Sequence, residues 1–168
     1  MIHSFLKDAD DRMTDPVVPR IKGGVVMANG SAIKIARRGT GDNAAVVARA
    51  YEAFNDADTA TLAKLFDENS SWHTPGRGSI AGSRMGRDAV FGQFSRYAGE
   101  TRGTFRANLL NVLESDDGRV VAVHHNCAER NGKSLDVLCC IVFELQNGRI
   151  LIGREHFYDL YAWDAFWS

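Results

Sequence analysis

Apolar residues recur at helical spacing in three stretches after residue 41. Asp42 or Asn43 can cap the first helix, Asp58 and Thr59 open the second, and the third begins near Asp88. We expect a short strand, a glycine-rich turn and a return between the second and third helices, in residues 71–86. The apolar positions that define the helices are Val47, Ala50, Tyr51 and Phe54, then Leu62, Leu65 and Phe66, then Val90, Phe91, Phe94 and Tyr97.

The period changes to that of strands after Gly103, with β-rich runs at about 104–114, 119–130, 133–145 and 149–160. The separators Asp116-Asp117-Gly118, Asn131-Gly132 and Asn147-Gly148 supply the positive-φ residues that tight hairpins require. The four runs therefore predict an antiparallel meander. Helices grouped before consecutive hairpins indicate an α+β fold, in which helices cover one face of a strongly bent sheet and leave a cavity beneath them.

The first 41 residues differ in composition from the rest of the chain. They carry seven Lys or Arg against four Asp, whereas residues 42–168 carry thirteen basic against seventeen acidic residues. Proline and glycine turn signals alternate there with two apolar stretches around Asn29-Gly30, a hairpin signal. We expect a partly disordered leader with a loose hairpin in residues 1–41, or alternatively a wrongly assigned start, and one domain in residues 42–168.

Overall composition limits the partners. A net charge of −1 over 168 residues gives no general attraction to nucleic acid or anionic membranes. No apolar run approaches the roughly 20 residues of a membrane helix, and the acidic start does not resemble an export signal. The odd number of cysteines, with Cys139 next to Cys140, predicts reduced thiols. These features together predict a cytoplasmic protein.

Several sequence segments carry a family likeness. They are Val-Val-Ala-Arg-Ala-Tyr-Glu-Ala-Phe-Asn at 46–55, Leu-Phe-Asp-Glu-Asn-Ser-Ser-Trp-His-Thr-Pro at 65–75, Gly-Arg-Asp-Ala-Val at 86–90, Phe-Glu-Leu-Gln-Asn-Gly-Arg-Ile at 143–150 and Phe-Tyr-Asp-Leu at 157–160. Residues 42–168 thereby resemble the SnoaL-like polyketide cyclases of the nuclear transport factor two-like superfamily, which includes ketosteroid isomerase and limonene epoxide hydrolase. The resemblance implies a cone of curved sheet closed by three N-terminal helices, a deep apolar pocket and a homodimer.

The catalytic acids of those relatives are replaced at the matching positions. The tyrosine and two aspartates of the isomerase correspond to Ala50, Thr74 and Ile141. In the limonene epoxide hydrolase frame, the water-holding tyrosine and asparagine correspond to Trp72 and Thr74, and the arginine to Ala122. The two aspartates of that frame correspond to His124 and His156.

Strand alternation places His124 with Asn126 on one face, and His156 with Tyr158 on one face of the last strand. The resemblance implies that both of these strand faces point into the cone. Two imidazoles there would suit acid–base catalysis near neutral pH, although a buried, hydrogen-bonded histidine is the structural alternative. We therefore expect an isomerase, cyclase or hydrolase that acts on a small apolar molecule with His124 and His156 as the proton-transfer pair. The residues expected to contact the substrate are Tyr51, Trp72, Thr74, Asn126 and Tyr158.

No metal or organic cofactor is expected. Catalytic zinc usually needs three protein ligands, and no third histidine or acid shares the strand faces of His124 and His156. The adjacent Cys139 and Cys140 also lack the spacing of cysteines in metal sites. The alternative function is a non-catalytic ligand-binding or association module, which the lost acids favour. The aromatic C-terminal segment, residues 160–168, should dock as a short helix or strand on its own pocket mouth or on a partner subunit.

Overall fold

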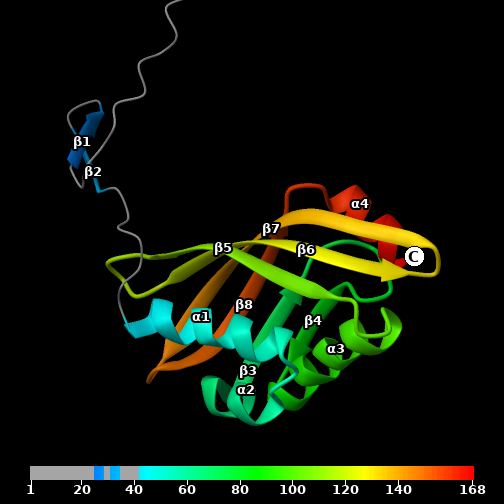
Figure 1. Ribbon diagram of the computed structural model, residues 1–168. Helices are drawn as coiled ribbons and strands as arrows, with labels where there is room; N and C mark the ends of the chain where they lie inside the picture. The colour runs from blue at the N-terminus through cyan, green and yellow to red at the C-terminus, as the bar shows by residue number, and fades with distance from the viewer. Residues whose placement is uncertain (1–24, 29–30, 35–41) are drawn as a thin grey trace, which may run out of the picture. The chain divides into compact units, whose positions relative to one another are not determined.

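The computed structural model describes residues 25–28, 31–34 and 42–168 (Figure 1). Strands β1 (Val25–Ala28) and β2 (Ser31–Lys34) form an antiparallel pair in a unit separate from the main domain. The expected disorder in residues 1–41 falls on residues that lie outside the described part of the chain. Residues 42–168 form the main domain.

The three expected helices are confirmed as α1 (Asp42–Asn55), α2 (Thr59–Leu65) and α3 (Arg87–Glu100). Asp58 caps α2, since its carboxylate accepts a hydrogen bond from the backbone N–H of Thr61 at 2.9 Å. Phe66 does not belong to α2 as expected: the helix ends at Leu65 and Phe66 begins a strand. All three helices lie along the same side of the sheet (Figure 1).

The sheet has six strands in the order β4-β3-β8-β7-β6-β5 and is not closed into a barrel. Only β3 and β8 pair in parallel, and the other neighbouring strands are antiparallel. The predicted meander is confirmed, with Asn131-Gly132 and Asn147-Gly148 at positive φ in its last two turns. The strand bounds are β3 (Phe66–Thr74), β4 (Gly82–Met85), β5 (Arg106–Glu114), β6 (Val120–Arg130), β7 (Lys133–Gln146) and β8 (Arg149–Phe157).

Strand β8 contains a bulge at Leu151. Its neighbours Ile150 and Ile152 pair with the consecutive residues Leu145 and Glu144, so Leu151 has no partner on β7. One extra residue shifts the alternation of side chains between the two faces. Beyond the bulge, the buried positions are Gly153 and Glu155 rather than the even-numbered residues.

The C-terminal segment forms the short helix α4 (Leu160–Trp167), as one of the two expected forms, and packs on its own chain, but none of its residues lines the cavity described below. Trp163 and Trp167 are buried and pack around Tyr97 and Phe105, with ring centroids 5.4–6.4 Å apart. Tyr97 and Phe105 also line the cavity described below, so α4 supports part of its wall.

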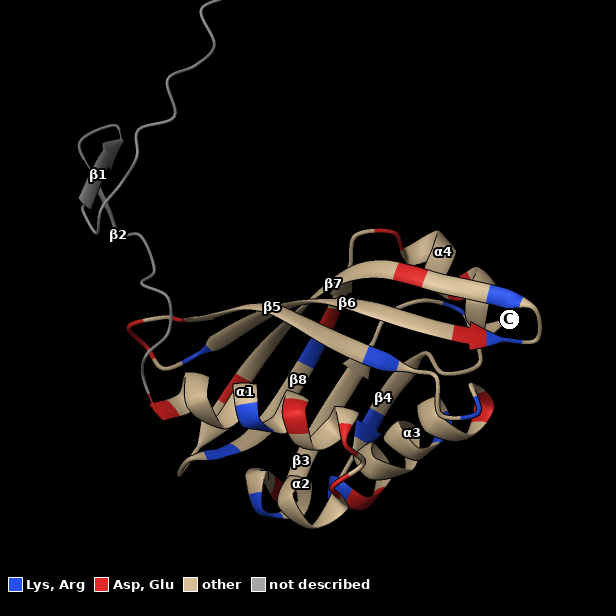
Figure 2. Cartoon of the chain, viewed as in Figure 1, with Lys and Arg blue, Asp and Glu red and all other residues tan. Residues whose placement is uncertain are grey.

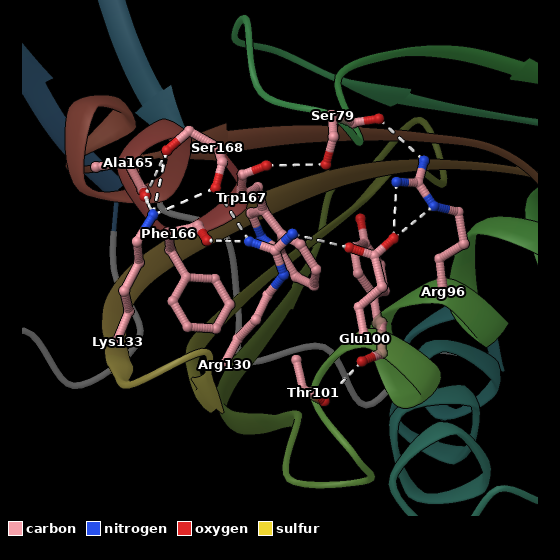
Figure 3. Close-up of polar contacts among 11 residues, drawn as sticks. Ser79, Arg96, Glu100, Thr101, Arg130, Lys133, Ala165, Phe166, Trp167 and Ser168 are labelled. Carbon is pink, nitrogen blue, oxygen red and sulfur yellow. Dashed lines mark hydrogen bonds and ion pairs between the residues drawn. The ribbon is translucent and has the colours of Figure 1, made fainter.

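Basic side chains from strands β6 and β7 hold the end of α4 (Figure 3). Arg130 donates to the carbonyl of Phe166 at 2.8 Å, and its guanidinium lies 5.5 Å from the ring centroid of Trp167. Lys133 donates to the carbonyl of Ala165 at 2.7 Å. Cations at the C-terminal end of a helix satisfy its free carbonyls and interact favourably with its dipole.

Basic and acidic residues are interspersed over the helices and strands of the main domain (Figure 2). Within the described residues, no helix has the length and apolar character needed to cross a membrane.

Candidate functional site

A largely apolar cavity lies between the concave face of the sheet and helices α1–α3. Its volume is about 50 Å³. Among its lining residues, only Phe54 and Phe94 are partly exposed, and their rings meet edge to face with centroids 5.2 Å apart. These two residues are therefore the part of the cavity lining that reaches solvent. The lining residues are Ala50, Tyr51, Phe54, Leu62, Phe66, Trp72, Phe94, Tyr97, Phe105, Ala107, His124, Asn126, Ile141, Phe143 and Glu155.

Glu155 is the one carboxylic acid among these lining residues. Its side chain is buried, and its Oε2 atom has no hydrogen-bond partner among the described residues. Burial raises the pKa of Glu155 to about 7, because a charged carboxylate loses its hydration in an apolar cavity. The neighbouring hydroxyl of Thr74 and indole N–H of Trp72 favour the charged form and offset part of this shift in pKa.

A hydrogen-bonded chain of Tyr51, His124 and Asn126 forms another polar group of the cavity wall. The Tyr51 hydroxyl lies 2.9 Å from Nδ1 of His124, and Nε2 of His124 lies 3.2 Å from Oδ1 of Asn126. Burial lowers the pKa of His124 to about 4, so the imidazole is neutral at neutral pH. Burial also raises the pKa of Tyr51 well above its usual value, which keeps its hydroxyl protonated.

Gln93 on α3 organises the side of the cavity near Glu155. Its Nε2 atom donates to Oγ1 of Thr74 and to the hydroxyl of Tyr97, each at 2.7 Å. Since the Thr74 oxygen accepts this bond, its own proton is free to point elsewhere. Thr74 thereby connects the buried amide of Gln93 to the environment of Glu155.

The structure does not bring the expected pair of imidazoles together: of His124 and His156, only His124 lines the cavity. His156 is exposed and lies opposite Cys140 on the outer face of the sheet, whereas Glu155 pairs with the inward-facing Ile141. The bulge at Leu151 is the physical reason, since it shifts the alternation of β8 by one residue.

Tyr158 also lies outside the cavity, although it is expected among the substrate contacts. It follows the end of β8, is 88% exposed, and bonds through its backbone N–H to the carbonyl of Leu138. The other expected contacts are buried on the cavity side: Tyr51, Trp72 and Asn126 line the cavity, and Thr74 lies behind it beside Gln93.

Glu155 is not among the residues predicted from the sequence, although it directly precedes His156. Knowledge of the bulge, beyond which odd-numbered residues of β8 face inward, would have identified Glu155. A bulge leaves no clear signal in a single sequence. Among the described residues, no group of three or more histidine, cysteine or acidic side chains is arranged to hold a metal ion. The chemistry of the cavity walls is therefore that of a carboxyl group of near-neutral pKa with uncharged hydrogen-bonding partners.

The fold is α+β, with a bent, open sheet and a cavity under three helices. Solved structures of the cystatin-like and nuclear transport factor two-like class share this fold. The chain belongs to the family of SnoaL-like domains, whose sequence model matches residues 47–152.

Individual relatives agree with this assignment. Bal32a, from a soil-derived mobile gene cassette, is 66% identical with a TM-score of 0.75, over 76% of this chain and 97% of its own. An uncharacterized protein of Mycobacterium tuberculosis is 33% identical over 73% of this chain and 94% of its own length. A putative SnoaL-like polyketide cyclase from Jannaschia shares the fold, with 15% identity and a TM-score of 0.63 over 76% of this chain and 92% of its own.

Proposed function

We propose that the protein is a SnoaL-like enzyme that transfers a proton on a small, largely apolar organic molecule, with Glu155 as the acid–base group. The reaction is an isomerisation, cyclisation or hydrolysis driven by side chains of the protein itself. The single observation that carries the proposal is the buried carboxyl group of Glu155, with an unpaired oxygen in an apolar cavity.

A carboxyl group in this position lowers the free energy of unfolding. Burying an ionisable group in an apolar cavity disfavours folding, so cavities seldom contain one without a functional reason. A pKa of about 7 allows Glu155 to accept a proton in one step and return it in the next near neutral pH. The buried acid thus has the property that proton-transfer enzymes require.

His124 is less suited to this role, although it lines the same cavity. Both of its ring nitrogens are engaged, by Tyr51 and by Asn126. Its lowered pKa also makes it a weak base. The residue therefore serves in the proposal as a neutral hydrogen-bonding group of the cavity wall.

The walls of the cavity and the family support the substrate class. Most lining residues are aromatic or aliphatic, which suits a molecule with little polar surface. A polyketide cyclase named among the proteins of the same fold is consistent with proton transfer on a carbonyl compound. The homodimer expected from the resemblance stays a prediction, which sedimentation of the purified chain can test.

The test measures deuterium uptake from heavy water into a panel of small cyclic ketones, read by mass spectrometry. We expect the wild type to accelerate exchange and Glu155→Gln to lower that rate by at least about a hundredfold. Glu129→Gln, which changes an exposed glutamate of β6, is the matched control and should exchange at the wild-type rate.

Wild-type exchange by Glu155→Gln would exclude this carboxyl as the acid–base group. If the folded wild type binds the ketones and returns them without deuterium, the non-catalytic ligand-binding module is the better account of the fold.

A further inference from the structure

The side-chain amide of Asn126 is buried at the cavity wall with one end paired and the other end free. Its exposed fraction is 2%. Oδ1 faces Nε2 of His124 at 3.2 Å, while Nδ2 has no hydrogen-bond partner among the described residues. A buried N–H group without a partner disfavours the empty cavity and favours an occupant that accepts hydrogen bonds.

The orientation of this amide and the protonation of His124 depend on each other. If Nδ1 carried the ring proton, Nε2 would be an acceptor and would require the Nδ2 end of Asn126 opposite it. The structure places Oδ1 there, which is the arrangement that a proton on Nε2 requires. Nδ1 is then the acceptor, and the Tyr51 hydroxyl donates to it at 2.9 Å. In this arrangement Nδ2 is the end of the amide that His124 leaves without a partner.

The charge of the lining residues restricts the occupant further. Glu155 is the one ionisable carboxyl group there, and no lysine or arginine lines the cavity. A negatively charged ligand would lie near this acid without a compensating cation, at a large cost in desolvation. The occupant that fits is uncharged.

We propose that Asn126 binds the carbonyl oxygen of an uncharged ketone, aldehyde or ester through Nδ2, and that Tyr51 and His124 are positioning residues that keep the amide in this donating orientation. The inference rests on the proposed function in taking this cavity as the substrate site. It does not require Glu155 to act on the bound molecule.

The test compares the binding of cyclohexanone and methylenecyclohexane, which differ mainly in the carbonyl oxygen, by NMR titration. We expect the preference for the ketone over the alkene to fall about five- to tenfold in Asn126→Leu. Ser70→Ala is the matched control, because Ser70 Oγ is also buried and unpartnered but does not line the cavity. That control should keep the wild-type preference.

A second measurement uses Tyr51→Phe and the ¹⁵N shifts of His124. In the wild type we expect a protonated Nε2 and an unprotonated Nδ1. Without the donated hydroxyl proton, the other tautomer becomes accessible and Asn126 can turn its oxygen to the cavity, so the ketone preference should fall as well. This readout remains informative if Asn126→Leu does not fold.

A wild-type ring proton on Nδ1, or an unchanged ketone preference in folded Asn126→Leu or Tyr51→Phe, would overturn the inference. Glu155→Gln separates it from the proposed function. That variant should lose deuterium exchange yet keep its preference for cyclohexanone. If the oxygen site alone is wrong, Asn126→Leu keeps the ketone preference while Glu155→Gln still loses deuterium exchange.

Discussion

The indole ring of Trp72 lies directly against the backbone of Gly153, in the space that any side chain at position 153 would occupy. The two residues are paired neighbours on the parallel strands β3 and β8. A Cβ atom at position 153 would overlap the six-membered part of the ring. Since Trp72 lines the cavity and influences the carboxyl group of Glu155, this glycine helps to shape the site.

Replacement of Gly153 by alanine should therefore displace Trp72 and lower the free energy of unfolding by about 1–3 kcal/mol, as overpacking of a core does. Urea unfolding followed by tryptophan fluorescence measures both effects. Gly92→Ala is the control, because Gly92 lies within α3 with no atom near its added methyl group. That substitution should raise stability by roughly 0.5–1 kcal/mol. Equal stability of Gly153→Ala and wild type would contradict the close packing.

The pKa shifts of Glu155 and His124 act on stability in opposite directions. The pKa of Glu155 is raised from 4.5 to about 7, so the free energy of unfolding falls as pH rises between these values. The pKa of His124 is lowered from 6.5 to about 4, so the free energy of unfolding falls as pH drops between these values. The two dependences largely cancel between pH 4.5 and 6.5.

Removal of the acid should expose the contribution of the histidine. We expect the free energy of unfolding of Glu155→Gln to fall by about 2–3 kcal/mol from pH 6.5 to 4.5, whereas that of the wild type stays nearly level. Urea titrations across this range provide the measurement. Glu129→Gln should reproduce the wild-type curve, and a Glu155→Gln curve parallel to it would show that Glu155 has an ordinary pKa in the folded protein.

Arg130 should contribute measurably to the docking of α4. Besides its bond to Phe166 and its contact with Trp167, it pairs with Glu100 at 3.2 Å (Figure 3). Arg130→Met keeps much of the apolar stem but removes these polar contacts, and should lower the free energy of unfolding by about 2 kcal/mol.

The matched control for this substitution is Arg119→Met. Arg119 forms an exposed ion pair with Asp117, and such pairs contribute little, so its loss should change stability much less than the loss of Arg130. Chemical unfolding of both variants provides the comparison. If they are equally stable, Arg130 does not hold α4 to the sheet.

Local sequence determined the elements and their order. Helical spacing and the Asp58 cap specify α1–α3, and the Asn-Gly turns specify the hairpins, because these signals act between residues close in the chain. The same alternation correctly placed His124 and Asn126 on the cavity face of β6, where the strand pairs with β7 without interruption.

The tertiary structure decided which residues of β8 face inward. The bulge at Leu151 depends on how β8 must bend to pair with β7 on one side and β3 on the other. No residue pattern within β8 predicts it. Through this one extra residue, Glu155 enters the cavity and His156 is turned to the outer face. The sequence thus determined the frame of the site, while strand pairing over long separations determined its acid.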